Sequence, residues 1–462
     1  MEIRKRQQLL KIETTLTKEE AEQIFGNENF NFIGELNILS NEINLDNPEL
    51  VYNALYIISK YVQMPNCNHN ILLKNDYFNV ILRYTKPDCE FNIRELSLQI
   101  LLFSSLKSQE ICDALICNNV FQYFDEIVKN DLNIIIVKYI SQISVAILSF
   151  SDKYYEYFYQ TSLLNSILLS LKESCKQNSK EPEIKNAERN VFSLFISIFE
   201  FQESLSIETA NAFISLFIEI MNDGRDFLLN CICTSLYVLI LRFSYMPQLI
   251  ANHGLMAFLY SYLKDTSQER NWESILQVIS LLFEKSSNDI IIILMKIISP
   301  KSLCDILLYN MKKNYTSDAF DLLYHLIVLN NTIVNEIPIL DIASKFSEVR
   351  DGTSFLIKKS FSIFMLAFID ITKSVDLFMA FLENGILDTI IEILNLTDDE
   401  QLTIFALDKL TDFYNFVLDS SLLTTKIKEF YTSQVMEIVD KNVNSSNDSI
   451  YSKCEKLQNL FM

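Results

Sequence analysis

A turn signal recurs about every 43 residues along this chain, and it constrains the fold more than any other feature. Each copy is a small or polar residue that stands immediately before an apolar run with helical spacing. Asp76, Asn119 and Ser162 are 43 residues apart, Gly254 follows 92 residues later, and Gly385 follows 131 residues after that. The two longer intervals are about two and three periods. A unit of this size cannot bury its own apolar face, so neighbouring units must stack on one another.

The remaining composition fits helices joined by short turns. Only 6 Gly and 7 Pro interrupt a chain that is 49% hydrophobic, which is too few breakers for a turn-rich β protein. Eight longer helices with a wide apolar stripe are expected. The period predicts an all-α, right-handed armadillo/HEAT-like superhelical solenoid of about eight repeats. The expected long helices are Ile93–Leu106, Ile134–Phe150, Ala187–Phe201, Leu228–Phe243, Trp272–Lys285, Ser317–Leu329, Phe355–Ile369 and Leu402–Leu418.

Three segments are expected along the chain. Residues 1–30 are polar and form a short N-terminal arm with a basic cluster, residues 31–421 carry the repeats, and residues 422–462 supply capping helices. A cap is needed because the last repeat would otherwise expose an apolar face. Two polar stretches, Cys175–Glu188 and Ser347–Ser354, are expected to be loop insertions on one edge.

The charge balance points to protein partners. The chain has 39 Lys plus Arg against 59 Asp plus Glu, a formal net charge of −20. A strongly acidic field repels nucleic acid and attracts Lys/Arg-rich segments. The same charge keeps an apolar-rich solenoid soluble, so composition leaves both explanations open.

The cysteines and the most apolar segment favour a reducing compartment without membrane insertion. The chain has nine Cys, an odd number, mostly within apolar helical patterns. Two pairs of cysteines lie close together in the sequence, Cys231 with Cys233 and Cys112 with Cys117. Neither has a second cysteine pair or a histidine at the spacing of zinc ligands, so no metal is expected. Leu132–Phe150 carries Lys138 in mid-span, which favours a buried solenoid helix over a membrane span.

Catalysis is not expected. His69, His253 and His325 are the only histidines, and none belongs to a recognisable nucleophile motif. The sequence also lacks a phosphate-binding loop, a dinucleotide-binding fingerprint and a metalloprotease pair, so no cofactor is expected.

One stretch resembles a named family. Leu45–Tyr84 is similar to the first armadillo repeat of the importin-alpha nuclear import adaptors, because the family also has an acidic helix start reading DPEL, a linker with proline and a following helix pair. The match continues without a gap through Val128 and on to Leu171. NGILDTIIEIL, which begins at Asn384, is similar to the family's generic repeat.

This resemblance implies a groove on the third helix of each repeat, where Trp and Asn side chains hold Lys-rich nuclear localisation peptides. In this chain the corresponding positions are Gln99 and Phe103 in one repeat and Gln142 and Ala146 in the next. The Trp–Asn array is therefore missing, and the single Trp, Trp272, lies in a later repeat. The resemblance also implies an arm that binds importin beta, and its candidate residues are Arg4, Lys5, Arg6 and Lys11.

The sequence therefore predicts a monomeric, non-catalytic protein-binding scaffold in the cytoplasm and nucleus. The favoured interpretation is an importin-alpha-like adaptor that carries basic segments into the nucleus, with importin beta as a second partner. The alternative is an armadillo/HEAT-type regulatory or assembly subunit with no transport role. The missing Trp–Asn array favours the alternative, whereas the match in the first repeats favours the adaptor.

Overall fold

The computed structural model is built from helices that stack in a repeating order. It describes residues 32–41, 47–64, 67–177, 179–397, 399–443 and 447–461, and no strand occurs within those ranges. The chain divides into two compact units, residues 1–243 and residues 244–462. In both units one long helix per repeat packs against the long helices of the repeats before and after it.

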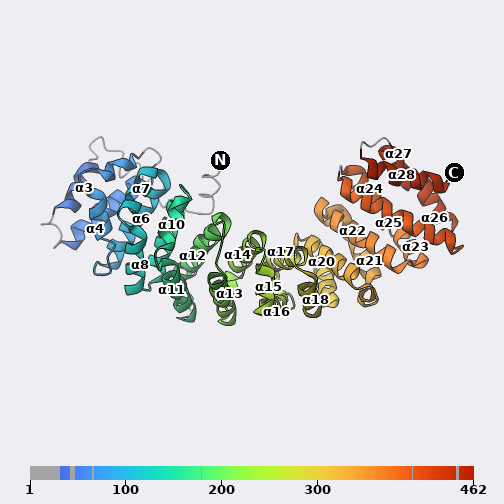
Figure 1. The fold of residues 1–462 in the computed structure, drawn as a ribbon, viewed down its shortest axis with the longest axis horizontal. Helices are drawn as coiled ribbons and strands as arrows, with labels where there is room; N and C mark the ends of the chain where they lie inside the picture. The colour runs from blue at the N-terminus through green and yellow to red at the C-terminus, as the bar shows by residue number, and fades with distance from the viewer. Residues whose placement is uncertain are drawn as a thin grey trace. The chain divides into compact units, whose positions relative to one another are not determined.

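In the first unit the long helices form a continuous layer (Figure 1). They are α4 (Pro48–Val62), α6 (Phe91–Lys107), α9 (Ile134–Leu148), α12 (Pro182–Phe201) and α14 (Leu229–Arg242). Each packs against the next in chain order. The shorter elements are α3 (Phe32–Ser40), η2 (His69–Leu73), α5 (Tyr77–Arg83), α7 (Gln109–Cys117), α8 (Val120–Asn130), α10 (Lys153–Tyr159), α11 (Leu163–Gln177), α13 (Ile207–Asn222) and η3 (Asp226–Leu228).

The second unit repeats this arrangement with another series of long helices. They are α17 (Glu269–Lys285), α20 (Tyr315–Leu329), α22 (Phe355–Thr372), α25 (Glu400–Asp419) and α28 (Asp448–Phe461), and each packs on the next. The shorter elements are α15 (Met246–Asn252), α16 (Leu255–Tyr262), η4 (Thr266–Gln268), α18 (Asn288–Ile297), α19 (Pro300–Tyr309), η5 (Asn331–Glu336), α21 (Ile339–Val349), η6 (Arg350–Gly352), α23 (Val375–Glu383), α24 (Ile386–Leu396), α26 (Thr425–Phe430), the π-turn η7 (Tyr431–Val435) and α27 (Met436–Asn442).

The recurring turn residue has a direct structural role in four of its five copies. Asp76, Asn119, Gly254 and Gly385 each precede a helix with φ between 53° and 67°. Glycine adopts this left-handed conformation without a Cβ clash, and Asn and Asp tolerate it better than other residues. Ser162 is the exception, because its φ is not positive.

All eight long helices expected from the sequence are present, which confirms the solenoid. The expectation of a long polar insertion at Cys175–Glu188 was wrong. Helix α11 continues to Gln177, and α12 already begins at Pro182, a residue that suits the first turn of a helix. The second expected insertion is shorter than predicted as well, because α21 extends to Val349 and η6 follows it directly.

The last helices cover the end of the second unit. Tyr431 in η7 is fully buried and its hydroxyl donates to the Leu410 carbonyl of α25 at 2.8 Å. Phe378 of α23 stacks on Phe413 of α25 with a centroid distance of 4.4 Å and meets Phe430 edge-on. These contacts pack α26 and η7 onto α23 and α25, and the capping role of residues 422–462 stays a prediction.

Candidate functional site

The face that the long helices α17 and α20 present in the second unit carries a row of acidic side chains. Glu273 lies on α17, and Asp318 and Asp321 lie on α20. The two aspartates are three residues apart, so they project from the same side of their helix. All three are half-buried. We call Glu273, Asp318 and Asp321 the acidic row.

The acidic row is electrostatically unusual because its charges are only partly compensated. Burial, together with Asp321 and Glu273 nearby, raises the pKa of Asp318 to about 7. Burial also raises the pKa of Asp321, although the Ser360 hydroxyl and Lys359 oppose this shift. Lys359 is already committed to Asp399, to which its Nζ donates at 2.6 Å. Among the residues described, none makes an ion pair or hydrogen bond with Asp318.

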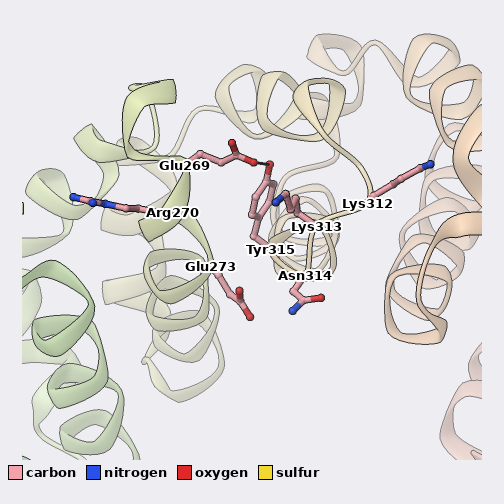
Figure 2. Close-up of a pocket in the computed structure, with 7 residues that line it drawn as sticks. All are labelled: Glu269, Arg270, Glu273, Lys312, Lys313, Asn314 and Tyr315. Carbon is pink, nitrogen blue, oxygen red and sulfur yellow. Dashed lines mark hydrogen bonds between the residues drawn. The ribbon is translucent and has the colours of Figure 1, made fainter. Parts of the chain in front are cut away.

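A pocket of about 410 Å³ opens beside the acidic row, between the first turn of α17 and the segment that leads into α20. Figure 2 shows that Glu269 and Tyr315 meet inside it, whereas Arg270 and Lys312 point in opposite directions. The Tyr315 hydroxyl donates to Glu269 Oε1 at 3.1 Å. Arg270 and Lys312 therefore do not gather around one point, and Lys313 lies beside Tyr315. The seven residues that line it are Glu269, Arg270, Glu273, Lys312, Lys313, Asn314 and Tyr315.

A larger depression of about 540 Å³ lies near the C-terminal end of α20. Tyr324 and Val328 of α20, Ile371 of α22 and Phe405 of α25 supply apolar and aromatic surface there. The Tyr324 and Phe405 rings meet edge-on with a centroid distance of 6.0 Å. We call this depression the aromatic hollow. The acidic row and the aromatic hollow both lie along α20.

In the first unit, the glutamines predicted to line a peptide groove take part in bonds between long helices. Gln99 of α6 donates to the Tyr139 hydroxyl of α9 at 2.9 Å, and that hydroxyl donates to Glu95 at 2.8 Å. Gln142 of α9 donates to Asn190 of α12 at 3.1 Å. Both glutamines therefore lie where successive long helices meet. We call the contacts made by Gln99, Tyr139, Gln142 and Asn190 the amide ladder.

The other two predicted groove residues lie deeper. Phe103 is 8% exposed and Ala146 is fully buried, so both pack inside the helix layer. The four residues are thus divided between the amide ladder and the core, and their role in peptide binding stays a prediction. Arg4, Lys5, Arg6 and Lys11 lie outside the residues that the structure describes.

The structure also brings together polar residues that no sequence motif signals. Glu188 of α12 and Arg225, just before η3, form an ion pair of 2.8 Å, and both side chains are buried. Ser174 of α11 donates to the same glutamate oxygen at 2.8 Å. His69 Nδ1 lies 3.4 Å from Ser104 Oγ, and both residues are buried. This pair sits inside the packed helices, where a substrate has no access.

The described residues show no metal centre, disulfide or membrane span. Within the described ranges, no group of three or more His, Cys, Asp or Glu side chains could hold a metal ion. All nine cysteines are free thiols, and five of them are buried. No helix in the described part of the chain is long and apolar enough to cross a bilayer. Helix α9, the most membrane-like segment by sequence, lies buried between α6 and α12.

Comparisons with known proteins place the fold and nothing finer. No protein-family model matches the chain, and no curated protein matches its sequence. Solved structures do match. An engineered protein aligns with a TM-score of 0.58 at 10% identity, covering 93% of this chain and 98% of that one.

Two natural proteins give similar matches. A chain from a structure of the cadherin and beta-catenin interaction, which a phosphorylation switch controls, has a TM-score of 0.57 at 10% identity and covers 99% of this chain and 94% of that one. A chain from a structure of Kap95p with RanGDP has a TM-score of 0.53 at 13% identity and covers 96% of this chain and 58% of that one. At these identities the likeness shows an armadillo/HEAT-like solenoid and does not single out importin-alpha.

Proposed function

We propose that this protein is a non-catalytic scaffold that binds other proteins, and that the acidic row receives a Lys/Arg-rich segment of the partner. The solenoid fold supports the first part, because stacked repeats expose a long series of helix faces suited to extended partners. The acidic row supports the second part. Among the proteins of similar fold, beta-catenin interacts with cadherin and Kap95p binds RanGDP. Solenoids of this kind therefore bind protein partners.

The observation that carries the proposal is the position of Asp318. Its carboxylate is half-buried beside two further acids, and no cation within the described residues pairs with it. A desolvated carboxylate near like charges is costly, and an ammonium or guanidinium group supplied from outside removes that cost. A lysine or arginine side chain of a partner is the group that fits.

The finer proposal is an importin-alpha-like adaptor that binds basic nuclear localisation segments and moves between cytoplasm and nucleus. The early-repeat resemblance supports it. The alternative is an armadillo/HEAT-type regulatory or assembly subunit with no transport role. The absence of the family's Trp–Asn array from Gln99, Phe103, Gln142 and Ala146 favours this alternative.

The test of the binding site is a titration with a Lys-rich peptide at low and high ionic strength. The variant Asp318→Asn/Asp321→Asn removes two charges with little change in shape. The matched control Asp305→Asn/Asp376→Asn removes two exposed charges from α19 and α23, outside the long helices. Two contacts of roughly 0.5–1 kcal/mol each should make the first variant about 5- to 30-fold weaker.

The control should lose much less affinity, because its charges act only through the general field. Equal losses in both variants would mean that net charge, rather than the acidic row, attracts the peptide. The companion variant Gln99→Ala/Gln142→Ala tests the groove predicted from the sequence. A loss larger than that of Asp318→Asn/Asp321→Asn would move the binding site to the first unit.

A second experiment separates the adaptor from its alternative. Purified importin beta should bind the full-length chain, and charge reversal at Arg4, Lys5 and Arg6 to Glu should weaken that binding at least tenfold. A parent chain that fails to bind importin beta would overturn the adaptor and leave the regulatory or assembly subunit.

A further inference from the structure

The aromatic hollow is a preformed apolar depression on the same helix as the acidic row. Its apolar lining is unusually open, since Val328 is 55% exposed and Leu329 is 46% exposed. Large aliphatic side chains at a helix end usually contact a neighbouring helix, and the hollow of about 540 Å³ lies directly against these two. The hollow therefore offers apolar surface that a partner could bury.

The charged groups that border the hollow are paired with each other, and the Asn330 side-chain oxygen is also engaged. Lys409 of α25 donates to Asp370 of α22 at 2.7 Å, and its Nζ lies 5.8 Å from the centre of the Phe405 ring. Asn330, at the end of α20, accepts hydrogen bonds from the amide and the hydroxyl of Thr332. These pairings engage both charged groups of the lining, so its uncharged surface is the part of the hollow that is free to bind.

The same pairings select the occupant. A second cation over the Phe405 face would be repelled by Lys409, and an anion would be repelled by Asp370 and by the acidic row. An uncharged apolar side chain avoids both effects and gains free energy by leaving water.

We propose that the aromatic hollow is a second subsite for the partner segment, and that it takes a bulky apolar or aromatic side chain next to the basic residue held by the acidic row. This proposal rests on the proposed function, because the charge of the acidic row is what brings a basic segment to α20. It adds a requirement to that function: the partner segment must carry an apolar side chain as well as a basic one, so net charge alone does not select it.

The helix sets the spacing of the two anchors. Val328 is seven residues beyond Asp321 and ten beyond Asp318, which corresponds to about 10–15 Å along an α-helix. An extended peptide covers about 3.3 Å per residue, so this distance corresponds to about three to five residues. The partner should therefore carry its bulky apolar residue about four positions from a Lys or Arg.

The experiment compares three Lys-containing peptides of equal charge. One has Phe four residues from the basic cluster, one has Ala at that position, and one has Phe moved several residues beyond the reach of the hollow. The first should bind the parent protein about three- to tenfold more tightly than the other two, because only its ring can leave water while the lysines contact the acidic row.

Matched variants locate the effect. Val328→Ser/Leu329→Ser should abolish the preference for the correctly spaced Phe, and the exposure of both residues predicts that the fold survives. The control Ile292→Ser/Ile293→Ser removes two aliphatic side chains of similar exposure, 52% and 41%, from α18 and should keep the preference.

Each outcome decides one claim. If the Phe and Ala peptides bind the parent equally, and both still depend on Asp318 and Asp321, the subsite is overturned and the proposed function stands. If none of the peptides binds, the proposed function itself fails. A preference that survives Val328→Ser/Leu329→Ser would also overturn the subsite. Self-association of the parent that this variant abolishes would make a second copy the occupant instead.

Discussion

The polar side chains on the long helices differ between the two units in how they are paired. On α9 and α12 of the first unit, polar side chains pair with neighbouring elements. Gln142 donates to Asn190, and Glu188 forms a buried ion pair with Arg225. On α17 and α20 of the second unit, Glu273, Asp318 and Asp321 lie close together with little compensation. The same repeat architecture therefore supports one face whose polar side chains mostly bond to one another, although Glu188 Oε2 and Ser141 Oγ are buried without a partner, and one face on which acids lie side by side.

This difference separates polar residues that bond between helices from acids that have no cation partner among the described residues. Buried polar groups in native proteins are almost always paired, and breaking a buried pair is costly. On the first face Gln99, Gln142 and the Glu188–Arg225 pair bond between elements, so these side chains position the helices. On the second face the half-buried Asp318 carboxyl lies beside two further acids and has no cation partner among the described residues, which is the arrangement that the proposed basic partner would complete.

The largest expected effect concerns the buried ion pair of the first unit. Glu188→Ala should destabilise the protein by about 3–5 kcal/mol, because it leaves the Arg225 guanidinium buried without its carboxylate. Chemical denaturation measures the loss, and hydrogen exchange in α12 localises it.

The matched change in the second unit, Asp318→Asn, should be neutral or stabilising at neutral pH. If both substitutions destabilise the protein equally, the contrast between the two faces is wrong.

A pH titration examines the second face alone. The pKa of Asp318 is raised from its ordinary value of 3.8 to about 7, so the folded state holds this proton more strongly than the unfolded state does. The resulting penalty is absent below about pH 4, grows between pH 4 and 7, and is complete above pH 7. Asp318→Asn should therefore raise the melting temperature relative to the parent at about pH 8 and lose that advantage toward pH 4.

The control for this titration is Asp305→Asn, whose carboxylate is exposed. A gain of the same size in this control would assign the effect to net charge rather than to Asp318. The affinity for a Lys-rich peptide should also fall as pH drops below about 7, because protonated Asp318 no longer attracts a cation. Affinity that rises on acidification would contradict the assignment.

The smallest expected effect concerns the amide ladder. Gln142→Ala should cost about 1 kcal/mol of stability, because Asn190 loses a hydrogen bond between helices. It should leave the affinity for a basic peptide unchanged within about twofold. A stability that does not change, together with clearly weaker peptide binding, would make this face the groove and reverse the comparison.

Local pattern was enough to predict the helices and most of the turns. Asp76, Asn119, Gly254 and Gly385 adopt left-handed backbone conformations because the residue type itself favours them. Ser162 does not, and its hydroxyl instead donates to Asp125 on α8 at 2.6 Å. A serine before a helix supports either arrangement, so the sequence could not separate the two.

The candidate site was much harder to predict, because it depends on packing between repeats. Glu188 and Arg225 are 37 residues apart, and no motif links them. The burial of Asp318 arises where α20 packs on α17, and the aromatic hollow combines Tyr324 of α20 with Phe405 of α25. The sequence resemblance directed attention to Gln99 and Gln142 because it concerned the early repeats, whereas the unpaired acids lie in later ones.

The most direct test of the acidic row as a binding site is zero-length carbodiimide cross-linking of a Lys-rich peptide to the full-length protein, followed by peptide mapping. The carbodiimide activates a carboxyl group, and an amide bond without a spacer forms where a lysine amine contacts it. We expect cross-links to concentrate on Glu273, Asp318 and Asp321 and to disappear at high ionic strength. Cross-links spread evenly over exposed acids, or concentrated on Glu95 of the first unit, would contradict this assignment.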